Sequence, residues 1–251
     1  MLSLAATLLV GALGGVVAFA MLPAPAPLPH GDPGSWNLVF DDEFGGTHLN
    51  TSLWSVGWFG SGITGPLTPN ALECFDPAQV KQHHGQLDLS FRLRPETCGG
   101  AQRPYTGAIV TTNGKFSFTY GFVEVRARLP GAHGVVYDWP DFWTDGQNWP
   151  ADGEDDVVEG LQGHACWHFH SLAGMPGRCD RTPLSHGWHT FGADWEPGSV
   201  TYYYDGQVIG TITTGITSSP MYLIISIGGD PRVGPVHRAT FRIAYVRVWQ
   251  H

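Results

Sequence analysis

The stretch Asp152–Gly160 reads DGEDDVVEG and is the most informative segment of the chain. Its expected strand, Glu154–Glu159, carries four carboxylates, which repel each other and oppose β-structure. Such a strand does not stabilise a fold, so the pattern indicates a functional role for these carboxylates. Because side chains alternate along a strand, Glu154 and Asp156 share one face and Glu159 would point to the other.

A single β-bulge at Val157-Val158 would return Glu159 to the face of Glu154 and Asp156, and bulges are frequent beside active sites. The outer pair would then lie about 13 Å apart along the backbone, at roughly 3.3 Å per residue. Two Glu side chains that lean inward by about 4 Å each leave a carboxyl gap of about 5 Å, as in a retaining glycosidase. A calcium site, a solvated charged face and an acidic edge strand remain open on spacing alone.

The rest of the chain predicts β-structure as well. Short alternating or β-rich runs are separated by Gly, Pro and Asn clusters, and no stretch keeps a 3.6-residue period. Asp205-Gly206 is a hairpin signal. Turns every 8–12 residues or so are typical of an all-β antiparallel sandwich or barrel. The expected strands are Asn37–Phe40, Gln86–Arg92, Gly107–Thr111, Phe116–Thr119, Gly121–Leu129, Trp139–Thr144, Glu154–Glu159, Cys166–Ser171, His189–Trp195, Ser199–Tyr204, Gln207–Ile212, Met221–Ile227 and Ala239–Trp249.

Composition excludes several classes of protein. The 251 residues include 34 Gly and 19 Pro but only 14% charged residues, against a usual share of about 25%. Long amphipathic helices need more charge than this, which excludes a helical bundle. The net charge of −9, with 13 Lys and Arg, lacks the basic footprint of a nucleic-acid binder. A neutral or weakly polar partner fits better, and we expect one monomeric domain.

Residues 1–22 predict a signal peptide or membrane anchor. Leu2–Leu22 has no charge, and Ala18-Phe19-Ala20 fits an A-x-A cleavage site. No Lys or Arg precedes the run, and its length approaches the roughly 20 residues that span a bilayer, so an uncleaved anchor stays open. Both alternatives place the domain, residues 35–251, outside the cytoplasm, with membrane contact only through this segment. The Pro-rich residues 23–34 predict an extended linker.

The four cysteines are Cys74, Cys98, Cys166 and Cys179, which permit three pairings. Cys166–Cys179 closes a short loop rich in Gly and Pro and is the favoured bridge, which leaves Cys74–Cys98. Zinc bound by Cys166, Cys179 and a nearby His is disfavoured, because no C-x-x-C element is present.

Three of the ten tryptophans, Trp139, Trp143 and Trp149, lie within eleven residues, close to the acidic stretch. For any single Trp a place in the core is the ordinary explanation, since Trp buries a large area. Aromatic faces are also the usual platform for sugar rings. Together with the neighbouring acids, the cluster favours a sugar-binding cleft.

Glu154-x-Asp156-x-x-Glu159 resembles the bulged E-x-D-x-x-E signature of glycoside hydrolase family 16. The similarity extends from Asn37 to the C-terminus. Segments that match the family's strands are Leu38–Phe44 (LVFDDEF), Tyr120–Pro130 (YGFVEVRARLP), Trp139–Trp143 (WPDFW), Trp188–Phe191 (WHTF), Trp195–Pro197 (WEP), Tyr204–Gly206 (YDG) and Tyr245–Trp249 (YVRVW).

This resemblance implies a concanavalin-like β-jelly roll, in which two curved antiparallel sheets form an open sugar-binding cleft. It implies that Glu154 is the nucleophile and that Glu159 is the general acid and then the base. Asp156 would hydrogen-bond the nucleophile and help to keep Glu159 protonated.

The resemblance also suggests residues that contact the sugar. Trp139 and Trp143 would stack sugar rings near the scissile bond. His168 and His170 share a face by period 2, and His170 resembles the family's cleft histidine, although a structural role for either stays open. Arg126 and Glu73 are further candidates for polar contacts.

Four positions depart from the family pattern. Asp155 stands where Ile or Leu is usual, and its buried carboxylate would need a partner, a proton or water. Asp141 replaces the usual Ala of W-P-A-F-W, and Ser226 stands where many members have Asn. Many members hold a structural calcium with a first-strand acid, here Glu43, and a final-strand Asp, here Ala244. A structural calcium is therefore disfavoured, and no cofactor is expected for the reaction.

The expected function is that of a secreted retaining endo-glycosidase of the laminarinase type, acting on β-1,3- or mixed β-1,3/1,4-glucan. Agarases and carrageenases share the bulge, but a sulfated substrate would favour a basic cleft. A non-catalytic glucan-binding protein usually loses the catalytic glutamates, and both are present here. A transglycosylase would use the same residues and stays open.

Overall fold

The computed structural model describes residues 26–180, 187–230, 232 and 238–251. Strands dominate these residues, with one 3₁₀ turn, η1. The elements are β1 (Asn37–Asp42), β2 (Ser55–Val56), β3 (Glu73–Phe75), η1 (Pro77–Gln79), β4 (Val80–His83), β5 (Gln86–Cys98), β6 (Ala101–Thr111), β7 (Gly121–Arg128), β8 (Gly131–Ala132), β9 (Val135–Val136), β10 (Trp139–Asp145), β11 (Glu154–Leu161), β12 (His164–His170), β13 (Gly177–Asp180), β14 (His189–Glu196), β15 (Ser199–Tyr204), β16 (Gln207–Ile212), β17 (Tyr222–Gly228) and β18 (Ala239–Gln250).

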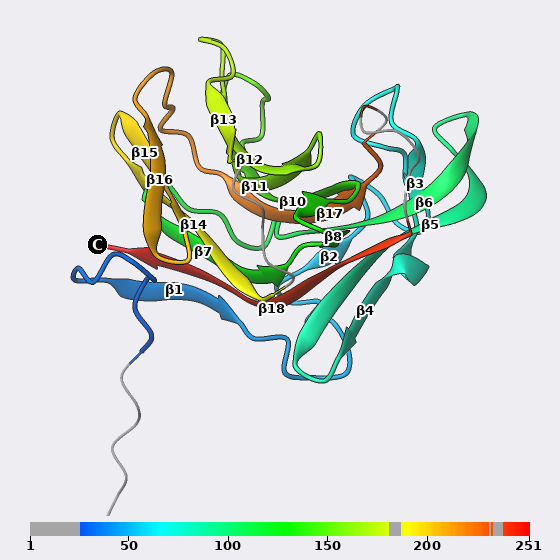
Figure 1. The fold of residues 1–251 in the computed structure, drawn as a ribbon, viewed down its shortest axis with the longest axis horizontal. Coiled ribbons are helices and arrows are strands. Elements are labelled where there is room, and N and C mark those ends of the chain that lie inside the picture. Colours follow the sequence, from blue (N-terminus) through cyan, green and yellow to red (C-terminus); the bar gives the residue numbers. More distant parts are fainter. Residues whose placement is uncertain (1–25, 181–186, 231, 233–237) are drawn as a thin grey trace, which may run out of the picture.

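The strands form two layers, which confirms the expected all-β jelly-roll sandwich (Figure 1). One layer, the acidic sheet, runs β13-β12-β11-β10-β17-β6, and the other, the back sheet, runs β5-β18-β7-β14-β15-β16. β1 pairs with β18 and β4 with β5. The two layers are joined because β5 also pairs with β6, so hydrogen bonds link 16 strands in one curved sheet.

The hydrophobic core lies between the two layers. Alternate side chains of β10 and β17 point into it, among them Phe142, Leu223 and Ile225, all fully buried. Large aromatic residues of the back sheet, including Trp195 and Phe241, meet them. Several tryptophans therefore serve the core, as expected from the area that a Trp side chain buries.

Most of the expected strands are present, and the hairpin signal is confirmed. Asp205 and Gly206 both have positive φ, of 46° and 74°, as the favoured two-residue hairpin turn requires. They join β15 to β16. The expected strand Phe116–Thr119 is wrong, because in this segment only Phe118 pairs, through an isolated bridge to Met221.

Both expected disulfides are confirmed. Cys74–Cys98 ties β3 to the end of β5, and Cys166–Cys179 joins two register partners on β12 and β13.

Residues 26–34 pack against the back sheet, so the expected linker is wrong for this described part. Trp249 Nε1 donates to the Pro27 carbonyl at 2.8 Å, and the backbone N–H of His30 donates to Glu124 Oε2 at 3.0 Å. These contacts begin the domain before residue 35. The expected signal peptide or anchor, residues 1–22, lies outside the described residues.

Within the described part of the chain, no helix has the length and apolar character to cross a membrane.

Candidate active site

The expected bulge in β11 is present and places three acids on one face. Register with β12 shifts between Asp156 and Glu159, and Val157 and Val158 both pack into the core. Because two consecutive valines point inward, Glu159 points outward again, on the same side as Glu154 and Asp156. We call this side of the acidic sheet, which faces away from the core, the acidic face.

Two glycines frame the strand. Gly153 precedes Glu154 with a φ of +96°, and a Cβ there would lie 2.3 Å from Thr217 Oγ1. Gly160 follows Glu159, and a Cβ there would lie 2.6 Å from Pro140 Cδ on β10. The chain can therefore enter and leave the acidic strand only with glycine at these positions.

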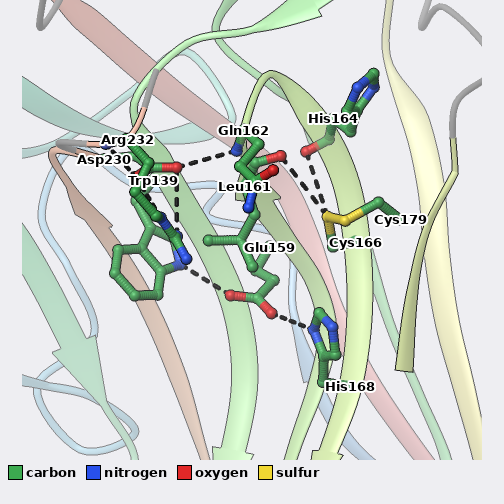
Figure 2. The surroundings of a disulfide bond; sticks show 10 residues. All are labelled: Trp139, Glu159, Leu161, Gln162, His164, Cys166, His168, Cys179, Asp230 and Arg232. Carbon is green, nitrogen blue, oxygen red and sulfur yellow. Dashed lines mark hydrogen bonds and ion pairs between the residues drawn. A yellow bond between two sulfur atoms is a disulfide. The ribbon is translucent and has the colours of Figure 1, made fainter. Parts of the chain in front are cut away.

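Glu159 is buried, with 4% of its surface exposed, and both of its carboxylate oxygens have partners. Trp139 Nε1 donates to Oε2 at 3.0 Å, and a hydrogen bond joins His168 Nδ1 to Oε1. Figure 2 shows Glu159 between these two rings, beside the Cys166–Cys179 disulfide. The two rings come from the strands on either side of β11 and hold the carboxyl group in one orientation.

Glu154 and Asp156 form a second group with His170. His170 Nε2 lies 3.0 Å from Asp156 Oδ2 and 3.6 Å from Glu154 Oε1. A carboxylate oxygen of Asp156 also lies within 4.8 Å of one of Glu154. His168 and His170 lie on one face, as their spacing predicted, with ring centroids 6.1 Å apart.

β10 adds a second row of acids to the acidic face. Asp141 is the register partner of Glu159, and Asp145 is the register partner of Glu154. Both are buried, and in each the Oδ1 atom lacks a hydrogen-bond partner within the described residues. Tyr222 OH donates to Asp145 Oδ2 at 3.3 Å. Asp145 was not identified from the sequence, although period 2 places it on the same face as Asp141.

Four carboxyl groups of the acidic face have raised pKa values. Burial, with the neighbouring Asp156, raises the pKa of Glu154 to about 9. Burial, followed by repulsion from other carboxylates, raises the pKa of Asp156 and of Asp141 well above the usual range. Burial also raises the pKa of Asp145 to about 7. The acidic face therefore retains protons at neutral pH.

The two tryptophans expected to stack sugars differ in the structure. Trp139 is half-buried, and the Arg232 guanidinium lies 5.3 Å from its ring centroid. Trp143 is only 5% exposed and packs with Tyr222 and Ile224. Its ring leaves almost no free surface, so the expected stacking at Trp143 does not fit the structure. Trp58 was not singled out from the sequence, and its ring centroid lies 5.8 Å from that of Trp143.

The structure separates the two residues expected to make polar contacts. Glu73 lies against Gly228, which is the register partner of Trp139. Its Oε2 accepts a hydrogen bond from Gly229 N at 3.1 Å. Burial raises the pKa of Glu73.

The expected cleft contact of Arg126 is wrong. This residue belongs to β7 of the back sheet and points away from the core, because its neighbours Val125 and Ala127 pack into it. Its guanidinium lies 5.8 Å from the Trp188 ring centroid. The back sheet and the core separate Arg126 from the acidic face.

Asp155 points between the layers, as expected from strand alternation. Tyr202 OH lies 2.6 Å from Asp155 Oδ1 and 3.1 Å from the His168 carbonyl oxygen. Burial raises the pKa of Asp155 to about 7. The unusual acid thus ties β11 to β15 of the opposite layer.

Two groups on the acidic face combine carboxylate and imidazole atoms within 4.8 Å of one another: Glu154, Asp156 and His170, and Asp156, Glu159 and His168. Such groups suit metal ions and proton chemistry equally. Within each group, hydrogen bonds or ion pairs already join the members. Glu43, the expected first-strand calcium ligand, pairs instead with Arg247 on β18.

Paired carboxylates on one strand face can divide the work of nucleophile and general acid–base. The bulged strand supplies a carboxylate at each end and a third between them. A family model described as "Glycosyl hydrolases family 16" matches residues 73–230, which include Glu73 and the whole acidic face.

Individual relatives agree with that match. A glucan endo-1,3-beta-glucosidase of Cryptopygus antarcticus is 33% identical over 205 residues, which are 71% of this chain and 70% of the relative. A beta-glucanase of Rhodothermus marinus is 30% identical over 194 residues, which are 69% of this chain and 64% of the relative. The chain therefore spans a little less than two thirds of the second relative.

The fold has close counterparts among solved structures. The catalytic domain of an endo-1,3-beta-glucanase (laminarinase) from Thermotoga petrophila RKU-1 superposes with a TM-score of 0.73 at 25% identity. The superposition covers 86% of this chain and 98% of that domain.

Proposed function

The chain belongs to glycosyl hydrolase family 16, and on that premise we propose that it is a retaining endo-glycosidase acting on β-1,3-glucan or mixed β-1,3/1,4-glucan. The observation that carries the proposal is the bulge of β11, which aligns Glu154, Asp156 and Glu159 on the acidic face. The glucanase names of the relatives support the choice of substrate.

In the proposed first step, a Glu154 oxygen attacks the anomeric carbon of the sugar at the scissile bond. Glu159 donates its proton to the glycosidic oxygen, the bond between that oxygen and the anomeric carbon breaks, and a covalent glycosyl-enzyme forms. In the second step Glu159 removes a proton from water, which attacks the same carbon and releases Glu154. Two inversions return the original anomeric configuration.

The protons retained on the acidic face set a condition on these roles. The attack needs an ionised Glu154, although burial and Asp156 raise its pKa. Burial, followed by repulsion from Glu159, also raises the pKa of Asp156. We place the retained proton on Asp156, which then donates to the Glu154 carboxylate and leaves the negative charge on the nucleophile. Side chains supply every group in this reaction, so the proposal requires no cofactor.

We also propose that the domain acts outside the cytoplasm. Disulfides persist in oxidising compartments, and all four cysteines form two of them, with no free cysteine among the described residues.

Product release tests the function directly. The purified protein is incubated with laminarin, mixed-linkage barley glucan, agarose and carrageenan, and released oligosaccharides are separated by chromatography. We expect products from laminarin or barley glucan, with the β-anomer appearing first by NMR. Products from agarose or carrageenan alone would overturn the substrate, and binding of laminarin without products would indicate a glucan-binding protein.

Two isosteric variants test the roles of the glutamates. Glu154→Gln is expected to abolish turnover, and Glu159→Gln to lower kcat by roughly 10²–10⁴-fold, the usual contribution of general acid–base catalysis. Asp88→Asn, on the back sheet, serves as the matched control with unchanged kcat. Circular dichroism checks the fold of each variant, and near-wild-type activity in either Glu variant would contradict its role.

A further inference from the structure

Asp141 is a buried residue of β10 on the acidic face. On β10 it lies between Trp139 and Trp143 on the same face of the strand. Its register partners are Glu159 on β11 and Ser226 on β17. It therefore lies between Glu159 on one side and Ser226 on the other.

One oxygen of the Asp141 carboxyl group lacks a hydrogen-bond partner among the described residues. The residue is 6% exposed, and its buried Oδ1 atom makes no hydrogen bond within the described residues. Its register partners bond elsewhere: Glu159 with Trp139 and His168, while Ser226 Oγ accepts from Trp143 Nε1 at 3.3 Å. A buried polar atom without a partner costs stability, so it calls for an explanation.

Asp155 provides the internal comparison. It lies on the next strand and is equally buried, yet Tyr202 satisfies its carboxyl group from the opposite layer. The fold therefore satisfies the acid that faces the core and leaves the acid on the acidic face unsatisfied. A ligand on that face can supply the partner that Asp141 Oδ1 lacks among the described residues.

A sugar is well suited to be this partner. Three neighbouring carboxylates disfavour an anion at Asp141, and burial together with Asp156, Glu159 and Glu154 raises its pKa. A protonated carboxyl group both donates and accepts hydrogen bonds, as does a sugar hydroxyl.

We propose that Asp141 binds a hydroxyl group of the sugar unit at the reaction centre and thereby helps to select the substrate. The inference rests on the proposed function and adds a specificity-determining residue to it. A site built to hydrogen-bond a hydroxyl rejects an analogue that lacks it, because the buried group is then left unpaired.

The test separates binding from turnover. Laminarihexaose is titrated calorimetrically into Glu154→Gln, which keeps the acidic face but cannot form the covalent intermediate, and into the same protein with Asp141→Ala or Asp141→Asn. We expect Asp141→Ala to weaken binding by about tenfold or more, the worth of one good hydrogen bond. Asp141→Asn keeps the shape and a donor, and should stay within about threefold of the parent. Asp88→Asn is the control and should not change binding.

Oligosaccharides that lack one hydroxyl at a time provide the second measurement. The loss caused by Asp141→Ala should disappear for the analogue without the bound hydroxyl and persist for all others, a coupling that a general loss of packing would not produce. Equal affinities of the parent and Asp141→Ala would overturn the inference, as would a loss that is the same for every analogue. Failure of the proposed function is a separate outcome: the wild-type protein would then release no product from laminarin and the parent would bind no laminarihexaose.

Discussion

Glu159 has both carboxylate oxygens engaged without a substrate, by His168 on one side and Trp139 on the other. A general acid must point its proton at one oxygen of the substrate, so fixing the carboxyl group in advance lowers the cost of reaching the reactive geometry. We therefore regard His168 as a positioning residue for Glu159.

Replacing His168 should affect turnover more than binding. In His168→Ala the Glu159 carboxyl group loses one of its two anchors, and kcat should fall by about 10–100-fold, since a misplacement of about 1 Å can have this effect. KM should change by less than about threefold, because the ring bonds Glu159 rather than a sugar. Steady-state kinetics on laminarin measure both constants. His168→Asn, which can still donate to Glu159, should recover part of kcat; a rise in KM with kcat unchanged would assign His168 to substrate binding instead.

At this scale the sequence predicted the acids better than their surroundings. Period 2 and one bulge were enough to place Glu154, Asp156 and Glu159 together, because both are properties of a single strand. The bond between His168 and Glu159 joins two strands whose register depends on the bulge. Trp58 reaches the acidic face from a loop far away in sequence, and Arg126 was misplaced because a motif does not reveal which layer its strand enters.

Individual strands were predictable where their own sequence alternates or is rich in β-formers. Long strands such as β7 and β18 agree with expectation. The two-residue strands β2, β8 and β9 were missed, since they exist only through their pairing partners. β3 was missed as well, and it pairs in parallel with β6, a contact with no local signature.

The disulfide between β12 and β13 lies beside Glu159. Cys166 is the register partner of Glu159, and His168 follows two residues later. In the double variant Cys166→Ser/Cys179→Ser we expect the free energy of unfolding to fall by about 3 kcal/mol, as for loops of about 15 residues. We also expect kcat to fall several-fold, because only backbone hydrogen bonds would then hold β13 against the edge of β12. Chemical denaturation and laminarin kinetics measure the two effects.

Cys74→Ser/Cys98→Ser is the matched comparison. This bridge closes a longer loop, with 24 residues of separation against 13, and joins strands other than β12. Its loss should lower stability by a similar amount and leave kcat closer to that of the wild type. Equal losses of kcat in the two double variants would show that the effect is general loosening.

The whole molecule combines a net charge of −9 with buried acids whose pKa values are raised on both sides of the acidic sheet. A group with a raised pKa binds protons more tightly in the folded state, so stability falls as pH rises from the unfolded to the folded pKa. For Asp155 this window runs from its usual value of 3.8 to about 7. Across it the shift of about 3 pH units corresponds to about 4 kcal/mol.

Thermal unfolding as a function of pH checks this expectation. The Tm of the wild-type protein should decrease between pH 5 and pH 8. Asp155→Asn removes the titrating group and leaves an amide oxygen for Tyr202, so its Tm should decrease less over the same range. Asp88→Asn should follow the wild-type curve. A wild-type Tm that is flat or rises toward pH 8 would contradict the raised pKa of these buried acids.

The position of β18 has a consequence for the order in which the protein can be made. The segment 239–250 pairs with β5, β7 and β1, so three earlier strands find this partner only when the segment has been made (Figure 1). Strands that emerge early from the ribosome cannot complete the back sheet until these residues have been synthesised, in contrast to proteins that fold from the N-terminus as they grow. A chain interrupted before residue 239 would carry all of β11 and its acids, yet would lack the strand that joins β5 and β7 in the layer on which they pack.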